Sequence, residues 1–242
     1  MSALKEKVAL VTGASGGIGA AISLALAKEG MQLLLTGRNA GKLAAVGETV
    51  QDLSPKVELL ALDLTDDAQL RSLAPYSVDV LVHSIGLFHA GPFATAPVEE
   101  LDAQYRVNVR VPYLLTQLLL PSLIARQGQV VFVNSSAGHH DAKAGVGAYS
   151  ATKHALRAMA DSFRDEVNKQ GVRVLTVFPG RTATAMQEEV HRFEGKPYAP
   201  EQLLQPEDVA AAVVHALSLP RTAELTDLHI RPMRPLPPIQ VG

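Results

Sequence analysis

The chain has 242 residues, of which 22 are Lys or Arg and 24 are Asp or Glu, so its formal net charge is −2. This balance lacks the basic excess of a nucleic-acid-binding surface. Hydrophobic residues make up 47%, enough for a sizeable core and too many for a disordered chain. The sequence contains no Cys, which excludes disulfide bonds, thiolate catalysis and Cys-ligated zinc, and is compatible with a reducing cytoplasm.

Short apolar runs alternate along the chain with segments of helical periodicity. The runs are rich in Val, Leu and Ile, as expected for strands buried on both faces. They occupy residues 8–11, 33–35, 57–62, 78–82, 130–133, 172–178 and 225–230, and the predicted helices occupy 17–28, 42–53, 66–73, 98–125, 147–170 and 206–217. This alternation predicts one doubly wound, Rossmann-like α/β domain over residues 1–242, with a mostly parallel seven-stranded sheet and helices on both faces.

Two stretches indicate where the protein is located. The N-terminal residues carry charges before any apolar run, which argues against a signal peptide. The longest apolar stretch, 111–124, is interrupted by polar residues and prolines, which argues against a membrane span. We therefore expect a cytoplasmic protein without a membrane partner.

A glycine-rich turn follows the first predicted strand directly and opens the first predicted helix, with the sequence T-G-A-S-G-G-I-G at 12–19. The first glycine permits a tight turn, and a later one lets the backbone approach a pyrophosphate. The start of the helix adds free N–H groups and the positive end of its dipole. An ordinary Gly-rich turn is the alternative. The strand before and the helix after favour a phosphate site made by Gly13, Ser15, Gly16, Gly17 and Ile18.

The end of the second predicted strand indicates which nicotinamide cofactor binds. A cofactor without a 2′-phosphate usually meets an Asp or Glu here, which hydrogen-bonds the ribose hydroxyl. The chain has neither at this point, and Arg38 instead offers a planar fork that suits a phosphate. A solvated loop Arg is the alternative, and Gly16 supplies no second basic residue inside the turn. We therefore expect NADP(H) rather than NAD(H).

Tyr149 and Lys153 lie four residues apart in a predicted helix, which places their side chains on one face about 6 Å apart. An ammonium beside a phenol favours the phenolate and lowers the phenol pKa from about 10. A Tyr with that neighbour can donate a proton near neutral pH. The pattern is weak when taken alone, because both residue types are common on helix surfaces. Ser136 lies thirteen residues before the Tyr and makes the pattern more specific.

These features together resemble the short-chain dehydrogenase/reductase family, in its short, single-domain branch. The residues that carry the resemblance are the glycine turn, Ser136 with Tyr149 and Lys153, and Pro179-Gly180, in the order of the family. The resemblance implies an oxidoreductase that transfers a hydride between NADP(H) and a small ketone or secondary alcohol, with a 3-hydroxy acid among the candidates. It also implies a homodimer or homotetramer, for which the helices 101–125 and 148–170 would form a four-helix interface.

The resemblance also implies roles for individual residues. Tyr149 would be the general acid in reduction and the base in oxidation, and Lys153 would lower its pKa and bind the nicotinamide ribose. Asn108 would bend its helix and feed a water relay toward the Lys. The remaining cofactor contacts implied by the family are Asp63, Leu64, Ser84, Pro179, Thr182 and Thr184.

Two adjacent serines compete for the role of holding and polarising the substrate oxygen. The alternation of a strand that ends at Val133 would send the side chains of Ser135 and Ser136 to opposite faces. The family's thirteen-residue spacing to the Tyr selects Ser136, a neutral donor aimed at developing charge. Ser135 would then be structural.

The segment after the fourth predicted strand departs from the family pattern. The family usually has N-N-A-G there, whereas this chain has H-S-I-G at 83–86. Ser84 still offers a hydroxyl near the cofactor, and His83 could brace backbone through a ring nitrogen. We expect these two side chains to replace the contacts of the family's asparagines, so that the site remains functional. A non-catalytic NADP(H)-binding sensor or scaffold is the alternative function that this departure keeps open.

The substrate is expected to meet three regions. His139 and His140 follow the serines and could bind an acidic or polar group, although a solvated turn explains them as well. Arg181 could grip a carboxylate or form a structural ion pair. The polar stretch 185–205 lacks clear periodicity, which predicts a lid. No third ligand stands near the histidines, so we expect no metal.

Overall fold

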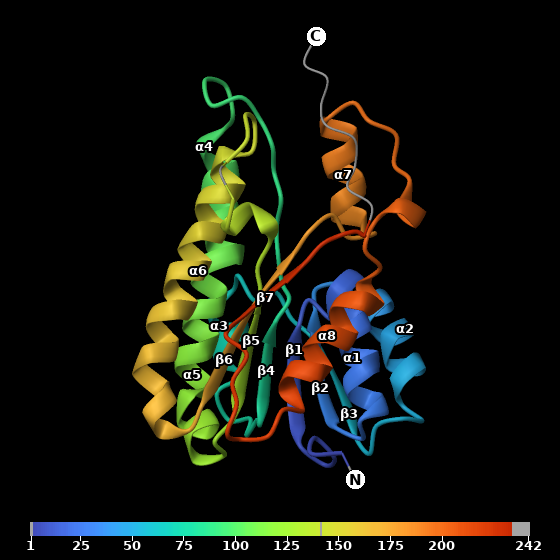
Figure 1. Ribbon diagram of the computed structural model, residues 1–242, viewed down its shortest axis with the longest axis vertical. Helices are drawn as coiled ribbons and strands as arrows, with labels where there is room; N and C mark the ends of the chain where they lie inside the picture. The colour runs from blue at the N-terminus through green and yellow to red at the C-terminus, as the bar shows by residue number, and fades with distance from the viewer. Residues whose placement is uncertain (1, 141, 234–242) are drawn as a thin grey trace.

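The computed structural model describes residues 2–140 and 142–233 of the chain. Seven strands of these residues form one sheet in the order β3-β2-β1-β4-β5-β6-β7, with every neighbouring pair parallel (Figure 1). The strands are β1 (Val8–Thr12), β2 (Gln32–Gly37), β3 (Val57–Ala61), β4 (Val80–His83), β5 (Gln129–Val133), β6 (Arg173–Pro179) and β7 (Asp227–Ile230). The predicted doubly wound fold is confirmed, and the sheet is parallel throughout.

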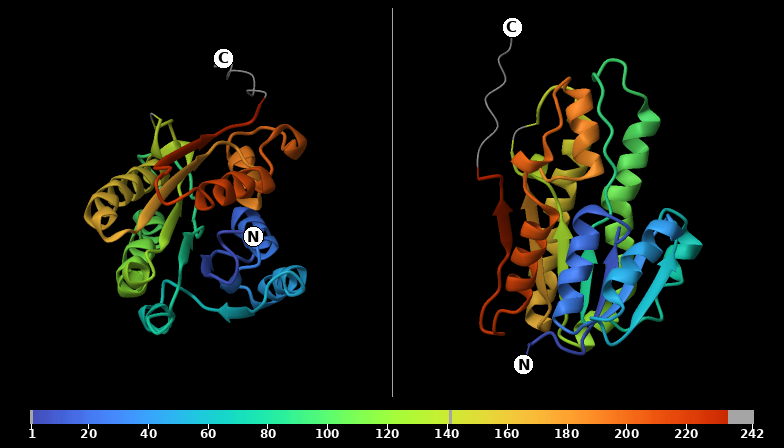
Figure 2. Two further views of the ribbon diagram at one scale, coloured as in Figure 1. Left: turned by 60° about the horizontal axis from the view of Figure 1, so that its bottom comes forward. Right: turned by 90° about the vertical axis from the view of Figure 1, so that its right-hand side faces the viewer.

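Helices cover both faces of the sheet, as Figures 1 and 2 show from three directions. One layer contains α1 (Gly17–Lys28), α2 (Ala40–Val50) and α8 (Pro206–Leu217). The other contains α3 (Asp67–Arg71), α4 (Val98–Tyr105), α5 (Val111–Ala125) and α6 (Gly147–Val167). Short 3₁₀ turns lie at Ser136–Gly138, Asn168–Gln170 and Pro200–Gln202.

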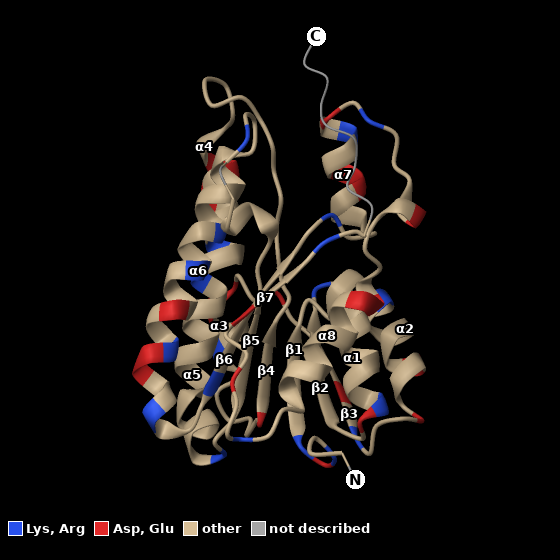
Figure 3. Cartoon of the chain, viewed as in Figure 1, with Lys and Arg blue, Asp and Glu red and all other residues tan. Residues whose placement is uncertain are grey.

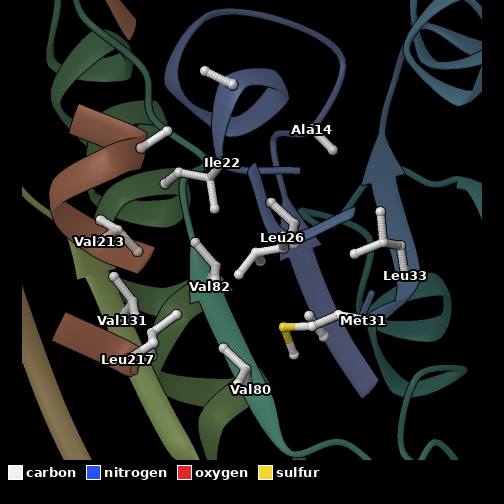
Figure 4. Close-up of a cluster of buried hydrophobic side chains, with 14 of the residues drawn as sticks. Ala14, Ile22, Leu26, Met31, Leu33, Val80, Val82, Val131, Val213 and Leu217 are labelled. Atoms are coloured by element: carbon white, nitrogen blue, oxygen red, sulfur yellow. The ribbon is translucent and has the colours of Figure 1, made fainter. Parts of the chain in front are cut away.

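Two apolar clusters hold these layers to the sheet. In the first, Ile22 and Leu26 of α1 meet Val82 of β4 and Val213 of α8 (Figure 4). The second lies between the sheet and α5 and α6. The central strands β1, β4 and β5 contain no Lys, Arg, Asp or Glu, and charged residues gather on the helices and loops (Figure 3). Burying one apolar side chain of these two clusters contributes roughly 1.5–3 kcal/mol to the stability of the fold.

The order of the strands determines where a ligand can bind. The chain moves outward from β1 to β2 and β3, then returns to β4 on the other side of β1 and continues outward to β7. The loops after β1 and β4 therefore diverge and leave a crevice at the carboxyl ends of these strands. In Figure 1 this edge faces the top, where α7 (Ala185–Phe193) and the loop before α4 stand on either side.

The helix predicted at 98–125 is interrupted. Residues Arg106–Arg110 form a π-helical stretch between α4 and α5. The combined run Val98–Ala125 is long enough to cross a membrane and contains an 18-residue window with a mean hydropathy of 1.2, but half of that window is buried inside the fold. A core helix passes the same test, so the run is weak evidence for a membrane span.

The stretch 185–205 contains a helix that the sequence analysis did not predict. Thr184 caps α7, because its hydroxyl accepts the Gln187 N–H at 3.3 Å. The expectation that this stretch lacks periodicity is wrong for its first nine residues, because Met186, Val190 and Phe193 follow helical spacing. The helix is short and stands away from the sheet, and His191 is its one buried side chain.

We expect Leu26→Ala to lower the free energy of unfolding by about 2–5 kcal/mol, because Leu26 is fully buried and its loss leaves a cavity. The matched control is Leu53→Ala, whose side chain is 44% exposed and whose loss should cost less than about 1 kcal/mol. Urea denaturation followed by circular dichroism measures both. Equal effects would contradict the packing described for α1.

Candidate active site

The glycine turn and the end of β4 are in close contact. Gly13 has a φ of +66°, and a Cβ built on it would lie 2.9 Å from the carbonyl oxygen of Ser84. Only glycine fits both conditions. Thr12 Oγ1 accepts the N–H groups of Ser84 at 3.1 Å and Ile85 at 3.3 Å, and it donates to Val82 O at 3.2 Å. The Thr hydroxyl thus braces the segment in which the chain departs from the family pattern.

A cavity of about 410 Å³ extends from the end of β2, past the glycine turn, to α6. Its lining contains the predicted residues Gly13, Ser15, Gly16, Gly17, Ile18, Arg38, Leu64, Ser84, Tyr149, Lys153 and Thr184. Three of the lining side chains are cations, and no Asp or Glu lines it within the described residues. An elongated, basic cavity on a glycine turn and a helix N-terminus fits a dinucleotide with several phosphates.

A second cavity, of about 270 Å³, adjoins the first and is covered by α7. Both cavities are lined by Tyr149, Asn134, Thr184 and Met186. Phe88 forms part of the second, and its ring meets the Tyr149 ring edge-on at a centroid distance of 5.1 Å. The phenol therefore lies where an elongated ligand in the first cavity would meet a small one in the second.

Tyr149 and Lys153 occupy one face of α6, as predicted, and are 8% and 3% exposed. Lys153 Nζ lies 5.8 Å from the centre of the Tyr149 ring and donates to Val133 O at 3.3 Å. Burial raises the pKa of Tyr149 to about 12, and burial lowers the pKa of Lys153 to about 8. The prediction that the ammonium lowers the phenol pKa is therefore wrong for this state, because desolvation by burial is the largest cause of the shift and the group that opposes it is the Ser135 hydroxyl.

The serine whose hydroxyl contacts the Tyr149 phenol is Ser135, which was expected to be structural, and not Ser136, which was expected to hold the substrate oxygen. A hydrogen bond with the Ser135 hydroxyl offsets part of the rise in the Tyr149 pKa. Strand alternation does not apply here, because Ser135 is the extended residue that caps the 3₁₀ turn Ser136–Gly138, with its hydroxyl accepting the Ala137 N–H at 3.1 Å. Ser136 lines the second cavity as well.

Asn108 lies in the π-helical stretch and joins two elements of the site. Its Oδ1 accepts the Leu87 N–H at 2.8 Å, and its Nδ2 donates to Leu87 O at 2.9 Å and to Thr152 Oγ1 at 3.0 Å. The Thr152 hydroxyl donates in turn to Tyr149 O at 2.8 Å. Asn108 thus fixes the loop after β4 against α6, which agrees with the expected bend in its helix.

His83 is fully buried at the end of β4, and its ring stacks on Phe132. Its Nε2 lies 2.8 Å from Thr116 Oγ1, so the ring contacts a side chain of α5. The sequence analysis had instead suggested a contact with backbone. Its Nδ1 has no partner among the described residues. Burial lowers the pKa of His83 to about 3.

Arg181 is paired with the lid. Its Nη2 lies 2.6 Å from Glu194 Oε1, at the end of α7, and Lys196 Nζ lies 3.1 Å from the other oxygen of Glu194. The pKa of Glu194 is lowered, because these cations outweigh its burial. The structural ion pair, one of the two alternatives for Arg181, is therefore present, although Arg181 also lines the second cavity.

Some predicted residues do not line the cavity expected for them: Asp63 and His139 line neither cavity, and two others line the second cavity instead of the first. Asp63 Oδ1 accepts the N–H and hydroxyl of Thr65, and these bonds lower the Asp63 pKa. His139 Nδ1 accepts from Arg157 at 2.8 Å, and its neighbour His140 lines the second cavity instead. Pro179 and Thr182 line the second cavity rather than the first.

The sequence analysis missed residues that only the fold brings to the cavities. Thr36 and Lys42 line the first, and Lys143 and Glu194 line the second. Lys42 stands four residues after Arg38 across a helix start, a spacing that could have indicated a second cation. Nothing in the sequence pairs Glu194 with Arg181.

We expect acid to destabilise the protein through His83. Its folded pKa is below the unfolded value of about 6.5, so neutral His83 stabilises the fold above that pH, and the stabilisation is lost as pH falls toward 3. Between pH 7 and pH 5 the loss is about 2 kcal/mol. The free energy of unfolding, measured by urea denaturation at both pH values, should fall by about 2 kcal/mol less in His83→Gln than in the wild type. The same pH dependence in both proteins would contradict the assignment.

Comparison with known proteins identifies the family. The family described as short chain dehydrogenase matches residues 7–195. An uncharacterized oxidoreductase of Staphylococcus saprophyticus is 31% identical over 241 residues, which cover 96% of this chain and all of that protein. The glycine betaine reductase of Emericella nidulans is 34% identical over 95% of this chain, but only 19% of that longer protein is matched.

Solved structures agree with this match. The alcohol dehydrogenase from the archaeon Thermococcus sibiricus, in complex with 5-hydroxy-NADP, superposes with a TM-score of 0.84 at 29% identity, covering 97% of this chain and all of that one. The serine dehydrogenase of Escherichia coli superposes with a TM-score of 0.78 at 27% identity, covering 93% and 97% of the two chains. With the glycine turn, the buried Tyr149 and Lys153 and the parallel sheet, these matches place the chain in the short-chain dehydrogenase family of oxidoreductases.

Proposed function

We propose that this oxidoreductase is an NADP(H)-dependent carbonyl reductase or alcohol dehydrogenase that acts on a small ketone or secondary alcohol. The observation that carries the proposal is the position of Tyr149, whose phenol borders both cavities beside the buried Lys153. The basic first cavity suits the dinucleotide, and the adjoining 270 Å³ suits a small substrate.

The chemistry divides between the cofactor and the chain. When bound, the nicotinamide supplies a hydride to the carbonyl carbon, or takes one up from the alcohol. Tyr149 gives its phenolic proton to the carbonyl oxygen, and Ser135 donates a hydrogen bond to that oxygen as its negative charge develops. Since burial raises the Tyr149 pKa to about 12, the phenol is protonated at neutral pH and holds the proton that reduction requires.

The charges around the second cavity bear on the substrate class. Arg181 is neutralised by Glu194, which leaves His140 and Lys143 as the other basic side chains of the lining. A small 3-oxo or 3-hydroxy acid would meet these two with its carboxylate, while its reacting oxygen lies at Tyr149. The 5-hydroxy-NADP bound in the structure of the archaeal alcohol dehydrogenase supports the choice of cofactor.

The alternative is a non-catalytic NADP(H)-binding sensor or scaffold. The departure from the family pattern at His83–Ile85 favours it, but Thr12 braces this segment through the backbone of Ser84 and Ile85. Assembly into a homodimer or homotetramer and a cytoplasmic location are also part of our proposal. The outer surfaces of α5 and α6, with a 260 Å³ hollow lined by Tyr113 and Phe163, would provide the subunit interface.

We expect Tyr149→Phe to lower turnover by at least about 10²-fold, because the ring remains while the proton donor is removed. The measurement is NADPH oxidation, followed by absorbance, across a panel of ketones, 3-oxo acids, diketones and aldehydes. NADPH binding, measured by fluorescence, should be retained in the variant. Unchanged turnover would contradict the role of Tyr149, and no turnover by the wild type on any substrate would favour the sensor.

The two serines give a matched pair of variants. Ser135→Ala should lower kcat/KM by roughly 10²–10³, the effect of removing one donor to the developing oxyanion. Ser136→Ala should lower it less than about tenfold, because the phenol contact is made by Ser135. The reverse order would return the role to Ser136, as the family spacing predicts.

A further inference from the structure

Asn134 is the first residue after β5, and its side chain bonds to two segments of the candidate active site. The residue is 5% exposed. Its Oδ1 accepts the Ser135 N–H at 2.9 Å, and its Nδ2 donates to Lys153 O of α6 at 3.0 Å. One hydrogen bond at each end of the amide therefore ties the end of β5 and the start of the following turn to α6.

The sheet holds Asn134 itself in place. Its backbone N–H donates to Val177 O at 2.8 Å, which continues the pairing of β5 with β6 by one residue. The preceding residue, Val133, accepts Lys153 Nζ at its carbonyl oxygen at 3.3 Å. The end of β5 thus bonds to both the side chain and the backbone carbonyl of Lys153, and the parallel sheet provides a fixed reference for α6.

The 3₁₀ turn Ser136–Gly138 packs against α6 with no spare room. A Cβ built on Gly138 would collide with Asn134 Oδ1 and would lie 2.7 Å from Lys153 O. The Gly138 N–H donates to Ser135 O at 2.9 Å, so the turn closes on the residue that precedes it. The turn, the amide and α6 therefore form one tightly packed junction, in which a displaced amide would also displace Ser135.

The candidate catalytic groups come from two different segments. Tyr149 and Lys153 share one face of α6, so the helix alone fixes them relative to each other. The Ser135 hydroxyl that meets the phenol belongs to the residue before the 3₁₀ turn, and Asn134 bonds to both segments. A shift of about 1 Å between such groups is enough to lower a rate by roughly 10²-fold.

We propose that Asn134 is a positioning residue, which holds the Ser135 hydroxyl against the Tyr149 phenol by tying the start of the turn to the backbone of Lys153. It acts through Ser135 and exchanges no proton with the substrate. The inference rests on the proposed reductase function, and it adds a residue to which the sequence analysis gave no role.

The test is a double-mutant cycle, with NADPH oxidation on the best carbonyl substrate of the panel as the activity measurement. Asn134→Ala should lower kcat by roughly 10–10²-fold, while KM and the NADPH dissociation constant change by less than about threefold. In the Ser135→Ala background the same substitution should lower kcat by less than about threefold, because no hydroxyl remains to be positioned. The matched control is Asn168→Ala, which removes an amide hydrogen bond to Glu224 just beyond the other end of α6 and should leave kcat unchanged.

A second variant keeps the test sharp if Asn134→Ala fails to fold. Asn134→Ser leaves a hydroxyl that can accept the Ser135 N–H but is too short to reach Lys153 O. It should lower kcat by a smaller factor than the alanine variant, again without a matching change in NADPH binding. Circular dichroism spectra of all variants verify folding, and NADPH fluorescence measures the dissociation constants.

The outcomes separate this inference from the proposed function. An unchanged kcat in folded Asn134→Ala would overturn the role of Asn134, and so would losses that multiply in the double variant, because Asn134 would then act independently of Ser135. A rise in the NADPH dissociation constant that matches the fall in kcat would overturn it as well, since that result indicates a binding role. These three results leave the reductase function standing. A wild type without turnover on the whole panel would overturn the proposed function and this inference with it.

Discussion

The pairing of β1 with β4 at the centre of a parallel sheet is the constraint on which both cavities depend. The two strands end at the same edge, and the Thr12 hydroxyl ties them by accepting two N–H groups of the loop after β4. Gly13 then turns so close to Ser84 that no side chain fits between them. From this edge the glycine turn leads into α1, and the loop after β4 leads to Leu87 and the amide of Asn108.

Burial, more than charge, determines the protonation of the candidate catalytic pair. Tyr149 and Lys153 lie between α6 and the sheet, and desolvation raises the pKa of the phenol and lowers that of the ammonium. At neutral pH the phenol keeps its proton, and Lys153, with a pKa of about 8, remains largely a cation. A protonated phenol can donate to a carbonyl oxygen without a prior step. The hydrogen bond with Ser135 is the one contact that favours the phenolate, and it links the phenol to the start of the 3₁₀ turn.

The two cavities differ in how their charges are compensated. At the β2 end of the first, Arg38 and Lys42 stand without a carboxylate among the described lining residues. In the second, Glu194 neutralises Arg181 and thereby also ties α7 to the loop after β6. A strongly anionic ligand therefore fits the first cavity better, and the second suits a smaller and less charged molecule.

The sequence determined what depends on neighbours along the chain. Apolar runs and helical periodicity predicted the strands, most helices and the parallel sheet, and the four-residue spacing put Tyr149 and Lys153 on one face of α6. Only the tertiary structure decided that Ser135 meets the phenol, that Lys42 joins Arg38, and how acidic the phenol is. Contacts between segments distant in sequence, and the exclusion of water around them, follow from packing, and neither is encoded in the spacing of residues.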